Sequence, residues 1–201
     1  MRFPDLLGLL IIAPPLLAAI VFHEVAHGWV AWRLGDPTAK AAGRLTLNPL
    51  KHLDPLGTLV LIFTQAIGWA RPVPVNPYYF RHPRRDMMWV GLAGPLANFL
   101  LALALALLYR ALAPLLPRSL EIMLVLGVRI NLGLGLFNLL PVPPLDGSRV
   151  LAGILPPSLA YPYLRYEFVG LFLLVLLIFT GVVGKIILPL IFGLSHVLLG
   201  G

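Results

Sequence analysis

Residues 16–32 read LLAAIVFHEVAHGWVAW, an apolar run with two histidines and a glutamate near its centre. The run is apolar from Leu6 onward and continues to Trp32, so it exceeds the roughly 20 residues that a helix needs to cross a bilayer. A signal peptide cleaved at the small residues Ala18 and Ala19 would leave the histidines close to a new terminus. We therefore expect an uncleaved spanning helix that carries polar side chains at membrane depth.

The composition of the whole chain supports this class. Of the 201 residues, 59% are hydrophobic and 11% are charged, whereas about a quarter of an ordinary soluble domain is charged. The formal net charge is +7, but most basic residues gather in two stretches between apolar blocks, where membrane orientation explains them without a nucleic-acid partner. Because the chain has no cysteine, a metal ion would have to be held by histidine, aspartate or glutamate.

The apolar blocks predict an all-α polytopic membrane protein with about five to six transmembrane helices, in a single domain over residues 1–201. The block at 56–70 is too short for a comfortable span and is bracketed by Gly57 and Gly68, so we expect a short re-entrant or tilted segment there. A small extended edge is expected near 71–77. The predicted spans are 6–33, 87–112, 119–140, 165–182 and 184–199.

The two loops that flank the 56–70 segment are rich in Lys and Arg. We expect both loops on the cytoplasmic side of the membrane, because loops on that side carry an excess of these residues. For both loops to lie there, the 56–70 segment must not cross the membrane. The loop between the next two spans holds only Arg110 and Arg118 and is expected outside. The basic residues of the two cytoplasmic loops include Arg33, Lys40, Arg44 and Lys51, then Arg71, Arg81, Arg84 and Arg85.

His23, Glu24 and His27 form the pattern His-Glu-x-x-His. Residues four apart on a helix lie on one face, so both imidazoles can bind one zinc ion while the adjacent glutamate reaches the water at the metal. The pattern is short enough to occur by chance. Polar groups in a lipid-embedded helix are costly, however, which favours a functional site over a histidine pair that bonds backbone carbonyls. A hydrolytic zinc site needs a third protein ligand.

Asp146 is the first candidate for that ligand. It follows an apolar block that ends in three prolines, and a glycine comes after it, so irregular backbone can hold the carboxylate at membrane depth. The alternative is an N-cap for a helix over 147–155. If the 56–70 segment does not cross and the next two blocks do, the histidines and Asp146 lie on the same side of the membrane. Charge placement and metal geometry therefore require the same topology.

Three motifs follow one another along the chain: FHEVAH at 22–27, GPLAN at 94–98 and NLLPVPPLDG at 138–147. In this order they resemble the site-2 protease family of intramembrane zinc metalloproteases. The resemblance is closest to the short bacterial branch of the family, which lacks PDZ and CBS domains. It extends over nearly the whole chain and includes GRLTLNP at 43–49 and RPVPVN at 71–76.

This resemblance implies one Zn²⁺ ion per chain, with His23, His27 and Asp146 as ligands and Glu24 as the general base. Asn98 would help to hold the substrate or the tetrahedral oxyanion, which suits a neutral amide donor; the alternative is an interhelical hydrogen bond. The implied activity is hydrolysis of peptide bonds in or near transmembrane segments. Its partners would be transmembrane protein substrates and the lipid bilayer, and the active site of this multi-pass protein of the cell membrane would face the cytoplasm.

Two further segments are candidates for accessory roles. The stretch 71–76 could pair with an unwound substrate as an added strand, with Val73 and Val75 contributing backbone groups, although its two prolines remove donors. His52 and Asp54 could form a secondary metal or gate site, although an aspartate before a proline in a loop is more often a turn former.

Two other functions compete with the protease. In a metal-binding membrane transporter the histidines and Asp146 would line a path, which favours additional polar residues along several helices. This chain instead concentrates its acids and histidines at one level. A non-catalytic membrane scaffold is the third reading, and it has no support because every expected catalytic position is filled. The sequence indicates neither the substrate nor the oligomeric state.

Overall fold

The computed structural model describes residues 6–57, 59 and 70–201. Within these ranges the chain is helical and has no strand, which confirms the predicted all-α class. Short 3-10 turns lie at Pro49–Lys51 (η1), Pro77–Tyr79 (η2) and Ala113–Leu115 (η3). The α-helices are α1 (Leu6–Arg33), α2 (Thr38–Ala41), α4 (Pro83–Leu112), α5 (Arg118–Asn138), α6 (Asp146–Ile154), α7 (Pro157–Arg165), α8 (Glu167–Phe179) and α9 (Val182–Leu199).

Among the residues that the structure describes, four helical stretches are long and apolar enough to cross a membrane, namely Leu10–Arg33, Pro83–Leu115, Arg118–Asn138 and Val182–Leu199. Helices α7 and α8 would add a fifth span if they count as one broken crossing, since they meet at an angle of 67°. The count is therefore four or five, close to the predicted five to six. Helix α8 alone has 13 residues, fewer than the about 20 of a full span. Most of the predicted 56–70 segment lies outside the described residues.

The predicted extended edge near 71–77 does not form a strand. Residues 71–76 have no regular secondary structure, and one antiparallel bridge between Leu53 and Ala70 precedes them. The two prolines of this stretch explain the difference, because a proline cannot donate to a sheet ladder. The segment is therefore free to bond with side chains elsewhere in the chain, among them Glu24 of α1, rather than with a neighbouring strand.

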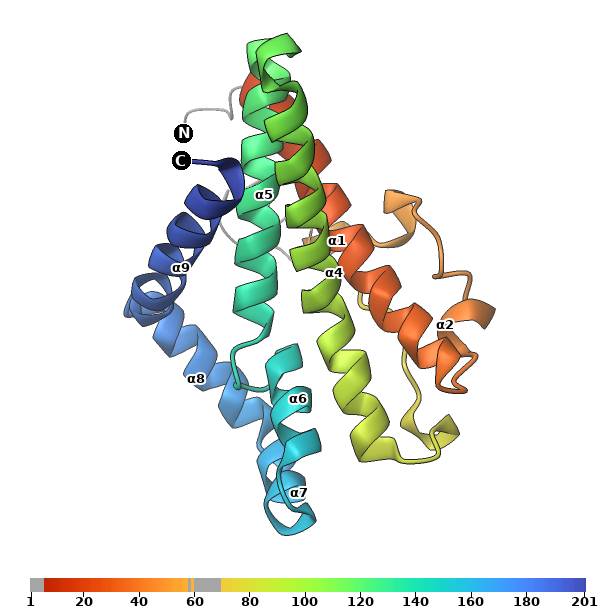
Figure 1. The fold of residues 1–201 in the computed structure, drawn as a ribbon. Coiled ribbons are helices and arrows are strands. Elements are labelled where there is room, and N and C mark those ends of the chain that lie inside the picture. Colours follow the sequence, from red (N-terminus) through yellow and green to blue (C-terminus); the bar gives the residue numbers. More distant parts are fainter. Residues whose placement is uncertain (1–5, 58, 60–69) are drawn as a thin grey trace.

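Helix α4 lies at the centre of the molecule and packs against α1, α5 and α6 (Figure 1). Small side chains make this packing close: Ala102 and Ala106 of α4 are buried against Val128 and Leu132 of α5. In membranes, helices associate through such close contacts because lipid is as apolar as the side chains it replaces. The central position of α4 allows one helix to support residues from both the N-terminal and the C-terminal half of the chain.

Candidate metal centre

Helix α1 places His23 and His27 one turn apart on the face that meets α4. Both side chains are buried, with exposed fractions of 6% and 7%. Their Nε2 atoms lie 3.0 Å apart. The four-residue spacing therefore brings the two imidazoles to a common point, as expected for residues on one helix face.

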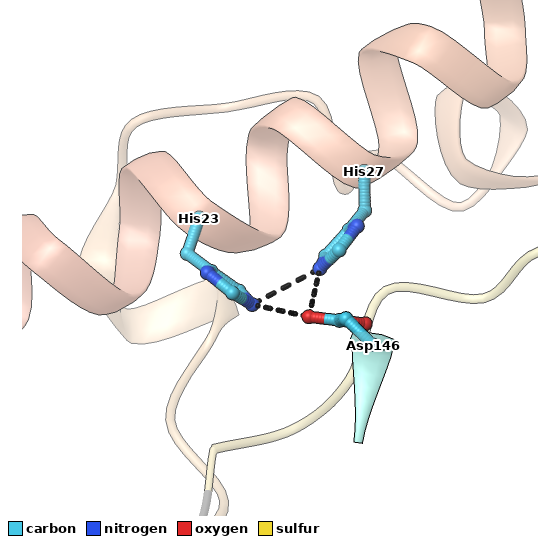
Figure 2. A group of neighbouring side chains, drawn as sticks. All are labelled: His23, His27 and Asp146. Carbon is cyan, nitrogen blue, oxygen red and sulfur yellow. Dashed lines mark hydrogen bonds and ion pairs between the residues drawn. The ribbon is translucent and has the colours of Figure 1, made fainter. Parts of the chain in front are cut away.

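Asp146 completes a cluster of three. Its Oδ2 lies 3.1 Å from Nε2 of His23 and 3.2 Å from Nε2 of His27 (Figure 2). Asp146 is the first residue of α6, and no side chain caps this helix, so the alternative of an N-cap does not describe its role. Within 6–57, 59 and 70–201, these three residues are the one group that could hold a metal ion.

The hydrogen bonds of both rings fix which nitrogen faces the aspartate. Nδ1 of His27 lies 2.6 Å from the carbonyl oxygen of Val90, which can only accept, so this nitrogen carries a proton. Nδ1 of His23 donates in the same way to Oδ1 of Asn98 over 2.6 Å. In the neutral rings both Nε2 atoms then direct lone pairs toward the carboxylate. Three acceptors that converge in this way are stabilised by a cation.

The size of the cluster suits zinc. The three ligand atoms are separated by 3.0, 3.1 and 3.2 Å, while a tetrahedral zinc ion with bonds of about 2.0–2.2 Å separates its ligand atoms by about 3.4 Å. A shift of a few tenths of an ångström would therefore accommodate the ion. Two neutral imidazoles and one carboxylate are also a ligand set of catalytic zinc sites, which keep the fourth position for water.

Asn98 of α4 is fully buried and uses both of its amide hydrogens within the protein. Its Nδ2 donates to the carbonyl oxygen of Ala19 over 3.0 Å and to Oδ1 of Asn131 over 2.9 Å. Asn131 is itself tied to the backbone of α5, since its Nδ2 donates to the carbonyl oxygen of Gly127 over 2.8 Å. In this arrangement Asn98 has no free donor for a substrate oxyanion. It contacts the His23 ring instead, which differs from the role that the resemblance implied.

Gly94 allows α4 to lie directly against the two histidine rings. A Cβ atom at this position would come within 2.6 Å of Cε1 of His23 and closer still to Nε2 of His27. One turn earlier, a Cβ atom at Gly91 would lie 3.0 Å from the carbonyl oxygen of Asp146. Gly94 begins the GPLAN motif, but neither glycine was predicted to contact the metal ligands. Small residues three positions apart in an apolar helix are the signal that could have found them.

Glu24 points toward the extended segment 71–76. Its Oε2 accepts a hydrogen bond from the backbone N–H of Val73 over 2.8 Å, and Val73 is buried. Val75 is half-buried and packs against a cluster that includes Phe80. The N–H of Val73, which we expected to contribute to substrate pairing, is therefore bound to Glu24 in this structure.

The segment 71–76 is fastened at both ends. Nη2 of Arg44 donates to the carbonyl oxygen of Arg71 over 2.6 Å. The backbone N–H of Asn76 donates to Oδ2 of Asp36 over 2.7 Å. Asp36 is fully buried and also accepts from the amide and the hydroxyl of Thr38. Burial lowers the pKa of the Arg44 guanidinium, and the positive charge of Arg71 adds to this effect, but arginine stays charged at neutral pH. No motif in the sequence marks Asp36 as part of the site.

His52 and Asp54 lie outside the metal cluster. Nε2 of His52 donates a hydrogen bond to the carbonyl oxygen of Thr46 over 2.8 Å. Oδ1 of Asp54 accepts from the amide of Gly57 over 2.7 Å, which is the contact of a turn-forming aspartate. Neither residue belongs to a metal-binding group in the described part of the chain. The geometry therefore favours the turn over a secondary metal or gate site.

Several known proteins that this chain resembles in sequence are zinc metalloproteases by name. The chain is 41% identical to YwhC of Bacillus subtilis over 180 residues, which are 86% of this chain and 81% of YwhC; that protein carries a provisional zinc-metalloprotease name. Rip2 of Mycobacterium tuberculosis, named in the same provisional way, is 35% identical over 151 residues, 71% of this chain and 56% of Rip2. Zinc metalloprotease MJ0392 of Methanocaldococcus jannaschii is 27% identical over 75% of this chain and 35% of its own length.

The chain thus spans most of YwhC and about half of Rip2. Neither a family model nor a solved structure matches it.

Proposed function

The chain belongs to the site-2 protease family of zinc metalloproteases, and from this premise we propose that it hydrolyses peptide bonds in or near the transmembrane segments of other membrane proteins. The observation that carries the proposal is the buried cluster of His23, His27 and Asp146 among helices apolar enough to span a membrane. Polar groups at this depth are costly unless they are paired or bind a ligand. A zinc ion bound by the three side chains would account for all of them.

Glu24 is the proposed general base. It follows the ligand His23 on α1, and the amide of Val73 orients its carboxylate. Zinc held by His23, His27 and Asp146 would supply a Lewis acid that acidifies a water molecule and polarises the peptide carbonyl. Glu24 takes a proton from the attacking water and returns a proton to the nitrogen of the leaving amine.

Asn98 acts through His23 in this proposal and is a positioning residue. Its hydrogen bond holds the ring in the tautomer that presents Nε2 to the metal. Because Asn98 is bonded in turn to Ala19 of α1 and Asn131 of α5, three helices determine the direction of one ligand.

The segment 71–76 is proposed to lie beside the bound substrate. A peptide bond in a helix is shielded by its own hydrogen bonds, so the substrate must present an extended stretch. Pro72 and Pro74 have no N–H, and the N–H of Val73 is bound to Glu24. A paired substrate would therefore donate to carbonyl oxygens of Val73 and Val75 rather than accept from Val73.

The proposed active site faces the cytoplasm. The metal ligands lie toward the C-terminal end of α1 and the start of α6, and α4 begins near the same level, since His27 bonds Val90. Basic residues gather in the connections at this end, among them Arg33, Lys40 and Arg84. Loops rich in Lys and Arg remain on the cytoplasmic side of most membrane proteins.

Substitution of Glu24 by glutamine tests the proposal. The purified wild type and Glu24→Gln are reconstituted in liposomes with a set of isotopically labelled single-pass membrane segments, and products are identified by mass spectrometry. We expect the variant to retain zinc and to lose cleavage. Cleavage by Glu24→Gln at the wild-type rate would rule out the mechanism, whereas zinc flux into the liposomes without any cleavage by the wild type would favour a transporter.

A further inference from the structure

A cavity lined by charged residues lies between the start of α4 and helices α6 to α8. Its volume is about 320 Å³, which suits a small ligand or the polar end of a larger one. Arg84 of α4, Arg149 of α6 and Glu167 of α8 line it, together with an apolar wall that includes Met87 and Leu164. None of these residues belongs to the metal cluster. The cavity therefore combines two cations, one anion and apolar surface.

Of the two cations of this cavity, Arg149 has one long ion pair in the described part of the chain and Arg84 has none. Nη1 of Arg84 is buried and has no hydrogen-bond partner among the residues that the structure describes. Arg149 comes no closer than 3.9 Å to Oδ1 of Asp146. In the described part of the chain, no ion pair links either arginine to Glu167. A buried guanidinium hydrogen without an acceptor is unfavourable, so the cavity is suited to a ligand that accepts from Arg84.

An adjoining hollow extends the positive surface. It shares Arg84 and Tyr161 with the first cavity and adds His82 and Arg85. No acidic side chain lines this second hollow. Arg84 thus lies where the two hollows meet, and in each of them cationic side chains outnumber acidic ones.

The cavity lies where two apolar helices begin. Helix α4 starts at Pro83 and α8 at Glu167. Directly after Glu167, Phe168 and Phe172 are 83% and 69% exposed. A ligand with its anionic group in the cavity can therefore lay an apolar part along α8. Basic pockets between membrane helices at the cytoplasmic interface are typical binding sites for lipid headgroups.

We propose that this cavity binds the phosphodiester headgroup of a membrane phospholipid, with the phosphate on Arg84 and Arg149 and the acyl chains along α8. Guanidinium groups bind phosphate oxygens in pairs of hydrogen bonds. The single negative charge of a phosphodiester balances two arginines and one glutamate. An acidic peptide would complement the charges too, but it would not cover the exposed phenylalanines of α8.

Glu167 gives the site a preference among headgroups. Glu167 lines the cavity and is exposed, so its carboxylate can accept a hydrogen bond from the ammonium of ethanolamine or a hydroxyl of glycerol. The quaternary ammonium of choline has no hydrogen to donate. Phosphatidylethanolamine and phosphatidylglycerol should therefore bind more tightly than phosphatidylcholine.

Native mass spectrometry of the purified full chain tests this site. The protein in detergent is incubated with equal amounts of the dioleoyl forms of the three phospholipids, and the lipid that stays bound is counted. We expect the wild type to retain the ethanolamine and glycerol lipids over the choline lipid, and Arg84→Gln to retain about tenfold less of them, as for the loss of one charge-assisted hydrogen bond. Arg84→Lys should recover part of the loss.

Arg33→Gln is the matched control, because Arg33 is exposed at the corresponding end of α1 and its loss removes the same charge. We expect this variant to bind lipid as the wild type does. Equal losses in Arg33→Gln and Arg84→Gln, or equal retention of all three lipids by the wild type, would overturn the proposal. Uptake of inorganic phosphate without lipid, or tighter binding of an acidic peptide, would also overturn it.

Glu167→Ala, which removes the hydrogen-bond acceptor, provides a second variant in case Arg84→Gln does not fold. It should keep the total amount of bound lipid and lose the discrimination against choline. Unchanged discrimination in this variant would contradict the assignment of Glu167. Zinc content and thermal unfolding of each variant show whether the fold is intact, and neither readout depends on protease activity.

Discussion

Oδ1 of Asn98 lies 2.6 Å from Nδ1 of His23, and the same side chain donates to Ala19 on α1 and Asn131 on α5. Asn98 therefore connects a metal-ligand candidate to the packing of three helices. A hydrogen bond to the distal nitrogen of a ligating histidine fixes its tautomer and direction. The metal affinity of this protein should consequently depend on a residue that does not touch the metal.

Asn98→Ala should lower zinc affinity between about tenfold and a hundredfold, the usual cost of removing such a partner. The measurement is a competition titration with a fluorescent zinc chelator. Asn138→Ala is the control, because Asn138 bonds the carbonyl oxygen of Leu134 within its own helix. Equal affinities of Asn98→Ala and the wild type would mean that the histidine ring is oriented without Asn98.

Gly94→Ala should disrupt the metal cluster. The new methyl group would overlap the rings of His23 and His27, so either the ligands or the helices must move apart. We expect loss of zinc binding together with a lower melting temperature. Gly193→Ala in α9 is the control, because no atom lies within 4 Å of the added methyl group. It should leave zinc binding and the melting temperature unchanged. A zinc-loaded Gly94→Ala with wild-type stability would contradict the observed approach of α4 to α1.

Asp146→Asn should separate zinc binding from folding. At a free zinc concentration one hundred times the Kd, bound zinc should raise the free energy of unfolding of the wild type by about 2.7 kcal/mol. A chelator that removes the zinc should abolish this stabilisation. Asp146→Asn should purify without zinc, so its melting temperature should not respond to the chelator. Differential scanning calorimetry measures both proteins. If the variant purifies with stoichiometric zinc, the third ligand is a different residue.

Asp36→Asn should reduce turnover without loss of zinc. Asp36 anchors Asn76 and thereby the segment whose Val73 amide holds Glu24, and a misplaced base slows the chemical step by about tenfold to a hundredfold. We expect a fall in kcat with unchanged metal content. Asp54→Asn, which alters a neighbouring turn, is the control. If Asp36 only stabilised the fold, Asp36→Asn would instead lower the melting temperature and leave the kcat of the folded fraction unchanged.

Local patterns were sufficient for much of the fold. The length of the apolar blocks predicted α1, α4, α5 and α9, because a spanning helix needs a continuous run of apolar residues. The span predicted at 165–182 corresponds to α8, which meets α7 at an angle of 67°, and hydrophobicity alone does not encode that angle. The extended edge expected near 71–77 forms no strand, since its hydrogen-bond partners are side chains of residues distant in the chain.

The sequence by itself determined that this is a helical membrane protein with two histidines and a glutamate on one helix, because helix periodicity and apolar length are local properties. It proposed Asp146 as third ligand but left a helix cap as the alternative. Only the tertiary structure decided that Asp146 meets the histidines, that Asn98 orients one of them, and that Glu24 is held by Val73. Each of these contacts joins residues far apart in the chain, and their distances are set by how closely α4 can approach α1 and α6 at Gly94 and Gly91.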